Sequence, residues 1–241
     1  MSQDPWAQEP YGVRFEWGPV GAARAGGHGG ALVVVDVLSF TTAVTVAVER
    51  GTAVHPAASR DAGVALARRT GAELAVGRHH VTDDHPWSLS PAALRSAPAR
   101  ARLVLPSPNG SAIAATVEDG VVVAACLRNA RAVAAWLRDG PVTVIAAGER
   151  WPDGSLRPAL EDLLGAGAVL AALARHDEES PEATAARTAY ESTRSVPDAV
   201  RHCASGVELR TSGFVEDVEI AVEIDTTGVV PLLLDGAFRR S

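Results

Sequence analysis

The sequence contains no lysine, so arginine supplies all 22 of its strongly basic side chains. With so much alanine, valine and glycine, this composition is typical of a GC-rich coding sequence, and the number of arginines alone says little about phosphate binding. Acidic residues outnumber arginines by 29 to 22, which gives a formal net charge of −7. A nucleic-acid surface would need clustered positive charge, and no run of basic residues with interleaved aromatic residues occurs. We therefore expect no nucleic-acid partner.

Cysteine is scarce as well. Cys126 and Cys203 are too few and too far apart for a CxxC zinc site or a disulfide framework, and a reducing compartment is the simpler interpretation. Residues 1–12 hold no basic segment followed by an apolar one, so we expect no signal peptide. The longest apolar stretches, such as residues 31–37, have the length of a strand and are too short to cross a bilayer. These absences predict a cytoplasmic protein with no membrane partner.

The overall composition is that of an ordinary globular protein, with 47% apolar and 21% charged residues. A chain of 241 residues can bury a substantial core without a disulfide or a structural metal. We see no internal repeat and no low-complexity linker. We therefore expect one domain over residues 1–241, with residues 177–206 as a candidate small helical lobe.

Apolar runs of strand length alternate with segments of helical periodicity along most of the chain. Residues 31–36 contain a continuous β-branched run, typical of a strand buried on both faces of a parallel sheet. The order strand, helix, strand indicates βαβ units and a mainly parallel or mixed sheet that is covered on both faces. The glycine-rich residues 21–30 are expected to form a flexible loop. The pattern predicts strands over 13–17, 31–36, 54–57, 74–76, 103–105, 121–125, 142–147, 218–224 and 229–234, and helices over 41–50, 61–69, 130–138, 159–175 and, in two exposed pieces, 177–201.

An acidic residue, Asp36, ends the buried strand just before a helix is expected to begin. In open α/β sheets ligands bind beyond the carboxyl ends of the strands, and a helix start offers free backbone N–H groups that suit a phosphate. An acid directly after four apolar strand residues is costly unless it is used or well paired, so we favour a functional role. The alternative is that Asp36 or Ser39 only caps the helix.

Further polar segments follow predicted strands in the same way. Between Ser107 and Ser111, the Asn109-Gly110 pair tolerates positive φ, so consecutive amides can converge on an anion, although Asn-Gly is also an ordinary turn. Gly148-Glu149-Arg150 follows another strand, and Glu161-Asp162 begins the longest helix. These acids suit Mg²⁺, which binds one or two carboxylates together with water and substrate phosphate. Acids at a helix start are also favourable through the helix dipole alone, and both explanations stay open.

Other polar residues match no known motif. Residues 79–85 are the densest cluster of His and Asp, but they lack the spacing of a zinc site, so we interpret them as an exposed loop, with a divalent-metal site as the alternative. Cys126 has no identifiable base beside it, which favours a buried small residue over a nucleophile. No G-x-S-x-G, P-loop or G-x-G-x-x-G motif is present.

Several short motifs occur together in one order along the chain. Val33 to Thr42 places an acid and Val-Leu before paired threonines, and residues 160–167 read Leu-Glu-Asp-Leu-Leu-Gly-Ala-Gly. Between and after them stand Asn109-Gly110-Ser111, Cys126 to Ala130, Ala146 to Gly148, Gly213 to Val218 and Val230-Pro231. In this order, from about Gly30 to Pro231, they resemble the magnesium-dependent 2-phosphosulfolactate phosphatases.

The resemblance implies hydrolysis of a small anionic phosphate ester, that of a sulfonated hydroxy acid, with Mg²⁺, as in coenzyme M synthesis. It also implies a three-layer α/β/α sandwich around a mixed, largely parallel sheet, and it suggests a homodimer. On this basis Asp36 and Glu161 are the predicted catalytic residues. The predicted magnesium ligands are Asp36, Glu161, Asp162 and Asp217, and the residues predicted to bind phosphate are Ser39, Thr41, Thr42, Arg78, Asn109, Gly110, Ser111 and Arg150.

The chain also departs from the family pattern. Ser39 and Ala112 stand where the family has arginines, whose fork suits a phosphate or a sulfonate. The family's glutamate before Arg78 is absent, as is the Gly-Asn before Ser90-Pro91. Two alternatives follow: a catalytically inactive protein on the same fold that binds a small anion or regulates, and a phosphatase for a smaller ester without a sulfonate. Arg78 or Arg150 could supply the missing charge from a neighbouring loop.

Overall fold

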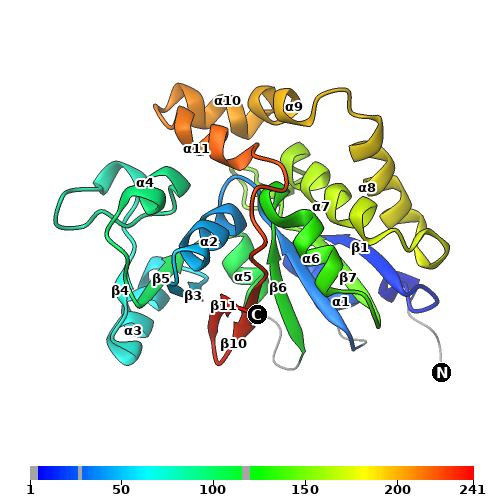
Figure 1. The fold of residues 1–241 in the computed structure, drawn as a ribbon, viewed down its shortest axis with the longest axis horizontal. Helices are drawn as coiled ribbons and strands as arrows, with labels where there is room; N and C mark the ends of the chain where they lie inside the picture. Colours follow the sequence, from blue (N-terminus) through cyan, green and yellow to red (C-terminus); the bar gives the residue numbers. More distant parts are fainter. Residues whose placement is uncertain (1–4, 27–28, 116–119) are drawn as a thin grey trace.

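The computed structural model describes residues 5–26, 29–115 and 120–241, and a nine-stranded mixed sheet forms its centre (Figure 1). The strands lie in the order β1-β7-β2-β6-β10-β11-β3-β5-β4. Their bounds are β1 Val13–Trp17, β2 Ala31–Val35, β3 Ala53–Ala57, β4 Glu73–Leu74, β5 Arg102–Pro106, β6 Val121–Ala125, β7 Val142–Ala146, β10 Pro231–Leu234 and β11 Ala237–Arg240. A separate small sheet pairs β8 Glu149–Arg150 with β9 Leu156–Arg157.

Two groups of parallel strands make up the large sheet, and a hairpin joins them. β1, β7, β2 and β6 pair in parallel, and so do β3, β5 and β4. Between the groups, β10 and β11 pair antiparallel with each other and with β6 and β3. Sheet twist accumulates at roughly 20–25° per strand, so we expect the five steps from β2 to β5 to rotate one group beyond a right angle from the other. The hairpin therefore connects the two groups of parallel strands.

Side chains of the central strand β2 alternate between two apolar cores. Val33 and Val35 belong to one core, and Leu32 and Val34 belong to the other. Helices α6, α7, α8 and α9 cover the first core, and α1, α2, α4 and α5 cover the second, which confirms the predicted three-layer α/β/α sandwich. The helices are α1 Gly18–Ala25, α2 Phe40–Glu49, α3 Arg60–Thr70, α4 Pro91–Ser96, α5 Gly110–Ala114, α6 Ala130–Trp136, α7 Leu160–Leu173, α8 Pro181–Ser192, α9 Val196–His202, α10 Ala204–Thr211 and α11 Val215–Ala221, with short 3₁₀ turns at Pro5–Ala7, Arg78–His80, Leu127–Asn129 and His176–Glu178.

Two glycines allow the longest helix, α7, to approach its neighbours closely. A Cβ on Gly165 would lie 2.6 Å from Cγ2 of Val37, just beyond β2, and a Cβ on Gly167 would lie 2.6 Å from Cβ of Tyr190 in α8. Larger residues would push the helix away from both. Because α7 is held against the end of β2, the two acids of its first turn are placed next to the residues that follow this strand.

The strand predicted over residues 218–224 is wrong. Residues 215–221 form α11, which starts after Gly213 at a φ of +90° and carries two acids in its first turn. The apolar residues Val218, Ala221 and Val222 have helical spacing and pack into the same core as α7. In this short segment the spacing of the apolar residues fits the period of two of a strand as well as the period of a helix. Burial of these apolar residues in the core selects the helix.

The flexible loop expected over residues 21–30 is also partly wrong. Gly21 to Ala25 belongs to α1, and residues 27 and 28 lie outside the described residues. A Cβ on Gly21 would lie 2.8 Å from Cβ of Glu16 in β1, so this glycine serves close packing between helix and strand.

The last predicted strand is confirmed as β10, and a further strand, β11, follows it. Asp235 and Gly236 connect the two with φ of +50° and +75°. Positive φ at both central residues is the type I′ hairpin turn, which the sequence Asp-Gly favours.

The segment expected to form a helical lobe, residues 177–206, contains α8 and α9 and the start of α10. α8 packs against α7 at Gly167, so this segment extends the helical layer on one face of the sheet. Within residues 5–26, 29–115 and 120–241, no helix combines the length and the apolar character that crossing a membrane requires.

Candidate active site

The carboxylate of Asp36 joins the starts of two helices. Asp36 follows β2 and is buried, with 6% of its surface exposed. Its Oδ1 accepts the backbone N–H of Phe40, the first residue of α2, at 3.0 Å. Its Oδ2 accepts the backbone N–H of Gly110, the first residue of α5, at 2.9 Å. Asp36 therefore caps α2, which is the alternative role expected from the sequence, and it also fixes the start of α5.

Glycine is required at position 110 for this contact. A Cβ there would lie 2.8 Å from Oδ2 of Asp36 and would also meet the ring of Phe40. The neighbouring Asn109 is half-buried, and its Nδ2 donates to Oε2 of Glu149 at 3.1 Å. The Asn-Gly segment thus brings the end of β5 against the residues that follow β2 and β7.

Asp162 ties the start of α7 to the ends of two strands. Its Oδ1 accepts the N–H of Val37, beyond β2, and its Oδ2 accepts the N–H of Gly148, beyond β7, both at 2.8 Å. Both carboxylate oxygens are therefore engaged, as they are in Asp36. This geometry gives Asp162 a clear part in holding the site together.

Two further acids, Glu161 and Glu149, complete an acid cluster with Asp36 and Asp162. Glu161 is buried, and one of its oxygens accepts the thiol of Cys203 at 3.1 Å. One oxygen of Glu161 accepts no hydrogen bond from the described residues, whereas the carboxylate of Glu149 accepts from Asn109 and from the backbone N–H of Arg150. The sequence places Glu149 after a strand but not beside the other acids, because only the fold shows that this strand end meets Asn109.

Burial raises the pKa of Asp36, Glu149 and Asp162. The pKa of Asp36 rises to about 6 because its carboxylate is desolvated, against the hydrogen bonds from the backbone, and repulsion from Glu149 and Glu161 adds to the rise. Burial and then repulsion from Asp36 and Glu161 raise the pKa of Asp162. The pKa of Glu149 is raised by burial and by Glu161. Repulsion between carboxylates that lie close together is relieved either when one of them is protonated or when a cation binds.

A guanidinium lies beside Ser39, at the start of α2. Arg78, in the turn after β4, donates through Nη2 to Oγ of Ser39 and through Nε to Oδ2 of Asp217 at 3.1 Å. The other oxygen of Asp217 accepts the hydroxyl of Ser90 and the N–H of Ala92. Both oxygens of Asp217 are thus engaged, and only one of them contacts Arg78. The predicted ligand Asp217 makes no hydrogen bond or ion pair with the acid cluster among the described residues.

The three predicted hydroxyl groups Thr41, Thr42 and Ser111 are fully buried. They donate to the backbone carbonyls of Asp36, Val37 and Leu105 at 2.7, 2.8 and 3.1 Å, respectively. In this structure they hold the loops that carry the acid cluster.

Two arginines border the small β8–β9 sheet. Arg150 is exposed and donates to the carbonyls of Pro108 and Gly154, at 3.3 and 3.2 Å. Arg157 is half-buried, donates to Oγ of Ser205 at 2.9 Å, and attracts the charge of Glu149. Arg157 was not predicted, because in the sequence it is one arginine among many.

The other polar candidates lie apart from this site. Residues 79–85 are exposed, as the loop interpretation predicted. Cys126 is fully buried with its thiol near Oγ1 of Thr45, and burial raises the pKa of the thiol, so it is a packed side chain. Among the residues the structure describes, no group of three His, Cys, Asp or Glu side chains is arranged to hold a metal ion.

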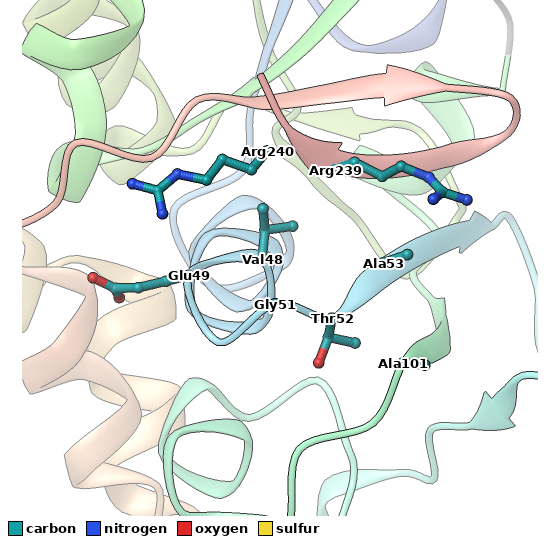
Figure 2. A pocket seen from close by; sticks show the side chains of 8 residues that line it. All are labelled: Val48, Glu49, Gly51, Thr52, Ala53, Ala101, Arg239 and Arg240. Atoms are coloured by element: carbon teal, nitrogen blue, oxygen red, sulfur yellow. The ribbon is translucent and has the colours of Figure 1, made fainter.

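Two small clefts differ in what surrounds them. One, of about 270 Å³, lies at the far end of α2 and includes Glu49, Thr52 and the C-terminal Arg239 and Arg240 (Figure 2). Figure 2 shows the two arginines pointing to opposite sides. None of the acid cluster lines this cleft. The other, of about 250 Å³, includes Arg78 and therefore borders the site.

Comparison with known proteins assigns the chain to a family. A family model described as 2-phosphosulpholactate phosphatase matches residues 23–236. The chain belongs to this family. The 2-phosphosulfolactate phosphatase of Methanothermobacter thermautotrophicus is 29% identical over 215 residues, covering 86% of this chain and 88% of the relative. Probable 2-phosphosulfolactate phosphatases of Thermotoga petrophila and Thermotoga maritima are 29% and 27% identical over 212 residues, covering 86% of this chain and 90% of each relative.

The pattern of the 2-phosphosulpholactate phosphatase family has an arginine where this chain has Ser39. The contact between Arg78 and Ser39 shows how this chain can do without that arginine. The serine is small, and the guanidinium of Arg78 reaches its hydroxyl from another loop. A positive charge is therefore present at the start of α2 after all.

Proposed function

We propose that this chain is a phosphatase that hydrolyses the phosphate ester of a small hydroxy acid, with 2-phosphosulfolactate as the first substrate to test. The family match over residues 23–236 carries this proposal. The acid cluster of the buried Asp36, Glu161 and Asp162 and the half-buried Glu149, bordered by Arg78, supports it, because phosphoryl transfer needs both a cation site and anion-binding donors.

The acids present fit Mg²⁺ of the kind that keeps several waters. Such a site needs one or two carboxylates plus the substrate phosphate, rather than a cage of protein ligands. Glu161 has a free oxygen and would hold the ion together with Glu149, whereas Asp36 and Asp162 use both of their oxygens to fix the backbone. When bound, Mg²⁺ would neutralise charge on the transferring phosphoryl group.

The remaining roles fall to side chains around the start of α2. The guanidinium of Arg78 and the hydroxyl of Ser39 would orient the phosphoryl oxygens, together with the side-chain amide of Asn109. Asp36 is the proposed catalytic carboxylate, acting on the phosphoryl group directly or taking a proton from water. Its raised pKa places its change of charge close to the range in which a general base works well.

Turnover of two esters tests this function. Wild type should hydrolyse 2-phosphosulfolactate, and more slowly phenyl phosphate, with Mg²⁺, and EDTA should abolish both activities. Asp36→Asn and Glu161→Gln should each lower kcat by at least about 100-fold, whereas Asp139→Asn, an exposed acid, should behave as wild type. Circular dichroism of each variant separates lost chemistry from lost folding. Equal activity of Asp36→Asn, Glu161→Gln and Asp139→Asn would remove the acid cluster from the mechanism.

A binding or regulatory protein is the second candidate, favoured by the absence of arginine at Ser39 and Ala112. Such a protein would be stabilised by the ester without consuming it. A rise in Tm with 2-phosphosulfolactate, with the ester recovered intact after long incubation with Mg²⁺, would support this candidate over the phosphatase.

A further inference from the structure

The cleft beside Arg78 contains a second arginine, Arg60, which no sequence motif singles out. The cleft holds about 250 Å³ and lies between the start of α3 and the segment after β4. Val76, Leu89 and Pro106 supply an apolar lining. Of the described residues that line it, none is acidic. A cleft of this size and charge suits a small anion with a short carbon chain.

The two arginines of the cleft are held in different ways. Arg78 is anchored by Asp217 and Ser39, with 18% of its side chain exposed. Arg60 is exposed and makes no hydrogen bond or ion pair within residues 5–26, 29–115 and 120–241. Arg60 is therefore available to an anion from outside the chain.

Arg78 connects this cleft to the acid cluster. Its guanidinium contacts Ser39, and the next residue, Phe40, donates its backbone N–H to Asp36. A ligand whose phosphoryl group lies at Arg78 would extend its remaining atoms into the cleft, toward Arg60. The apolar lining would contact the short carbon chain.

We propose that Arg60 binds the second anionic group of the substrate, a carboxylate or a sulfonate, while Arg78 faces the phosphoryl group. This inference rests on the proposed phosphatase function. A guanidinium fork matches both kinds of oxyanion with paired hydrogen bonds. Arg60 is then the residue that distinguishes a phosphorylated acid from a simple phosphate ester.

The test compares Arg60→Gln with Arg68→Gln. Arg68 is exposed on the same helix, lies outside the cleft, and loses the same charge on substitution. Charge-assisted hydrogen bonds predict that Arg60→Gln lowers kcat/KM for 2-phosphosulfolactate by about 10-fold or more. The same variant should hydrolyse phenyl phosphate, which has no second anion, as wild type does. Arg68→Gln should match wild type with both esters.

Calorimetry with sulfolactate, which has no phosphate, separates this inference from the proposed function. If wild type hydrolyses neither ester, the phosphatase proposal fails, yet sulfolactate that binds wild type and binds Arg60→Gln about 10-fold more weakly still supports the anion site. The inference is overturned if wild type gives no heat with sulfolactate. It is equally overturned if Arg60→Gln and Arg68→Gln bind sulfolactate alike, or if Arg60→Gln loses activity on both esters in parallel.

Discussion

At the scale of single residues, the small side chain of Ser39 leaves space for the guanidinium of Arg78. Its side chain is almost fully buried, and its hydroxyl accepts a hydrogen bond from Arg78, a residue 39 positions further along the chain. The contact could not be read from the sequence, because nothing local to Ser39 or to Arg78 specifies it.

Ser39→Arg should destabilise the protein and should not improve binding. The new guanidinium would enter a buried site next to Arg78, and an uncompensated buried charge costs about 3 kcal/mol or more. Urea unfolding should show this loss, whereas Ser39→Ala should lose only about 1 kcal/mol, for one hydrogen bond. Tighter binding of 2-phosphosulfolactate by Ser39→Arg would contradict this expectation.

The raised pKa of Asp36 predicts that the stability of the protein depends on pH. Its folded pKa, about 6, lies above that of an unfolded aspartate, so the folded state binds the proton more tightly. The contribution of protonated Asp36 to the free energy of unfolding is fully present below about pH 4 and is lost as the pH rises through about 6.

The difference in unfolding free energy, wild type minus Asp36→Asn, should therefore fall by up to about 3 kcal/mol between pH 4 and pH 7 in the absence of divalent ions. Mg²⁺ should reduce this fall if it neutralises the acid cluster. Chemical denaturation at several pH values measures it, with Asp139→Asn as the control that should show no such trend. A constant difference across this range would mean that Asp36 does not titrate as described.

At the scale of elements, the start of α7 is fixed from two directions. Asp162 accepts hydrogen bonds from beyond β2 and β7, and Gly165 lets the helix lie directly against the end of β2. The Glu-Asp and Gly-Ala-Gly parts of one short motif therefore serve one purpose: they place the acids and keep the helix close.

Gly165→Ala should lower stability by about 1–3 kcal/mol, because its Cβ would overlap Val37 in a packed core. Since the helix start would shift, kcat should fall as well. The control is Gly228→Ala, where a Cβ would meet nothing within 4 Å. Urea unfolding and turnover of 2-phosphosulfolactate measure both effects, and equal stability of the two variants would contradict the packing argument.

The sequence predicted the local features of the fold better than their contacts. The strand ending at Asp36, the helix beginning near Glu161 and the Asn109-Gly110 turn were predictable, because each depends on neighbouring residues. α11 was not, because its apolar spacing fits two periods and only the core around Val218 selects one. Glu149 and Arg60 belong to the proposed site only through strand ends that meet across the sheet, and a single sequence does not specify that pairing.

At the scale of the whole molecule, the β10–β11 hairpin connects the two parallel groups of the sheet. Leu232 pairs with Val123 on one side and Phe238 pairs with Val54 on the other. Phe238 is fully buried, and its ring packs edge-on against that of Phe40 at 6.1 Å between centroids. This aromatic pair joins the hairpin to the start of α2, where the proposed site lies.

Phe238→Ala should therefore destabilise the protein by about 3–5 kcal/mol, the usual cost of removing a fully buried aromatic ring. Leu234→Ala, in the same hairpin but with 45% of its side chain exposed, should change stability by no more than about 0.5 kcal/mol. Thermal and urea unfolding compare them. Similar losses in both variants would show that the hairpin does not depend on this ring for its place in the sheet.

The position of this hairpin also has a consequence for how the protein is made. During translation β1 to β7 leave the ribosome before β10 and β11, so the strand edges of β6 and β3 stay unpaired until residues 231–240 have been made. Unpaired edges of this kind recruit strands from other molecules. Synthesis of residues 231–240 is then the step that closes the sheet, and a nascent chain that stalls before residue 231 would expose two open edges to its neighbours.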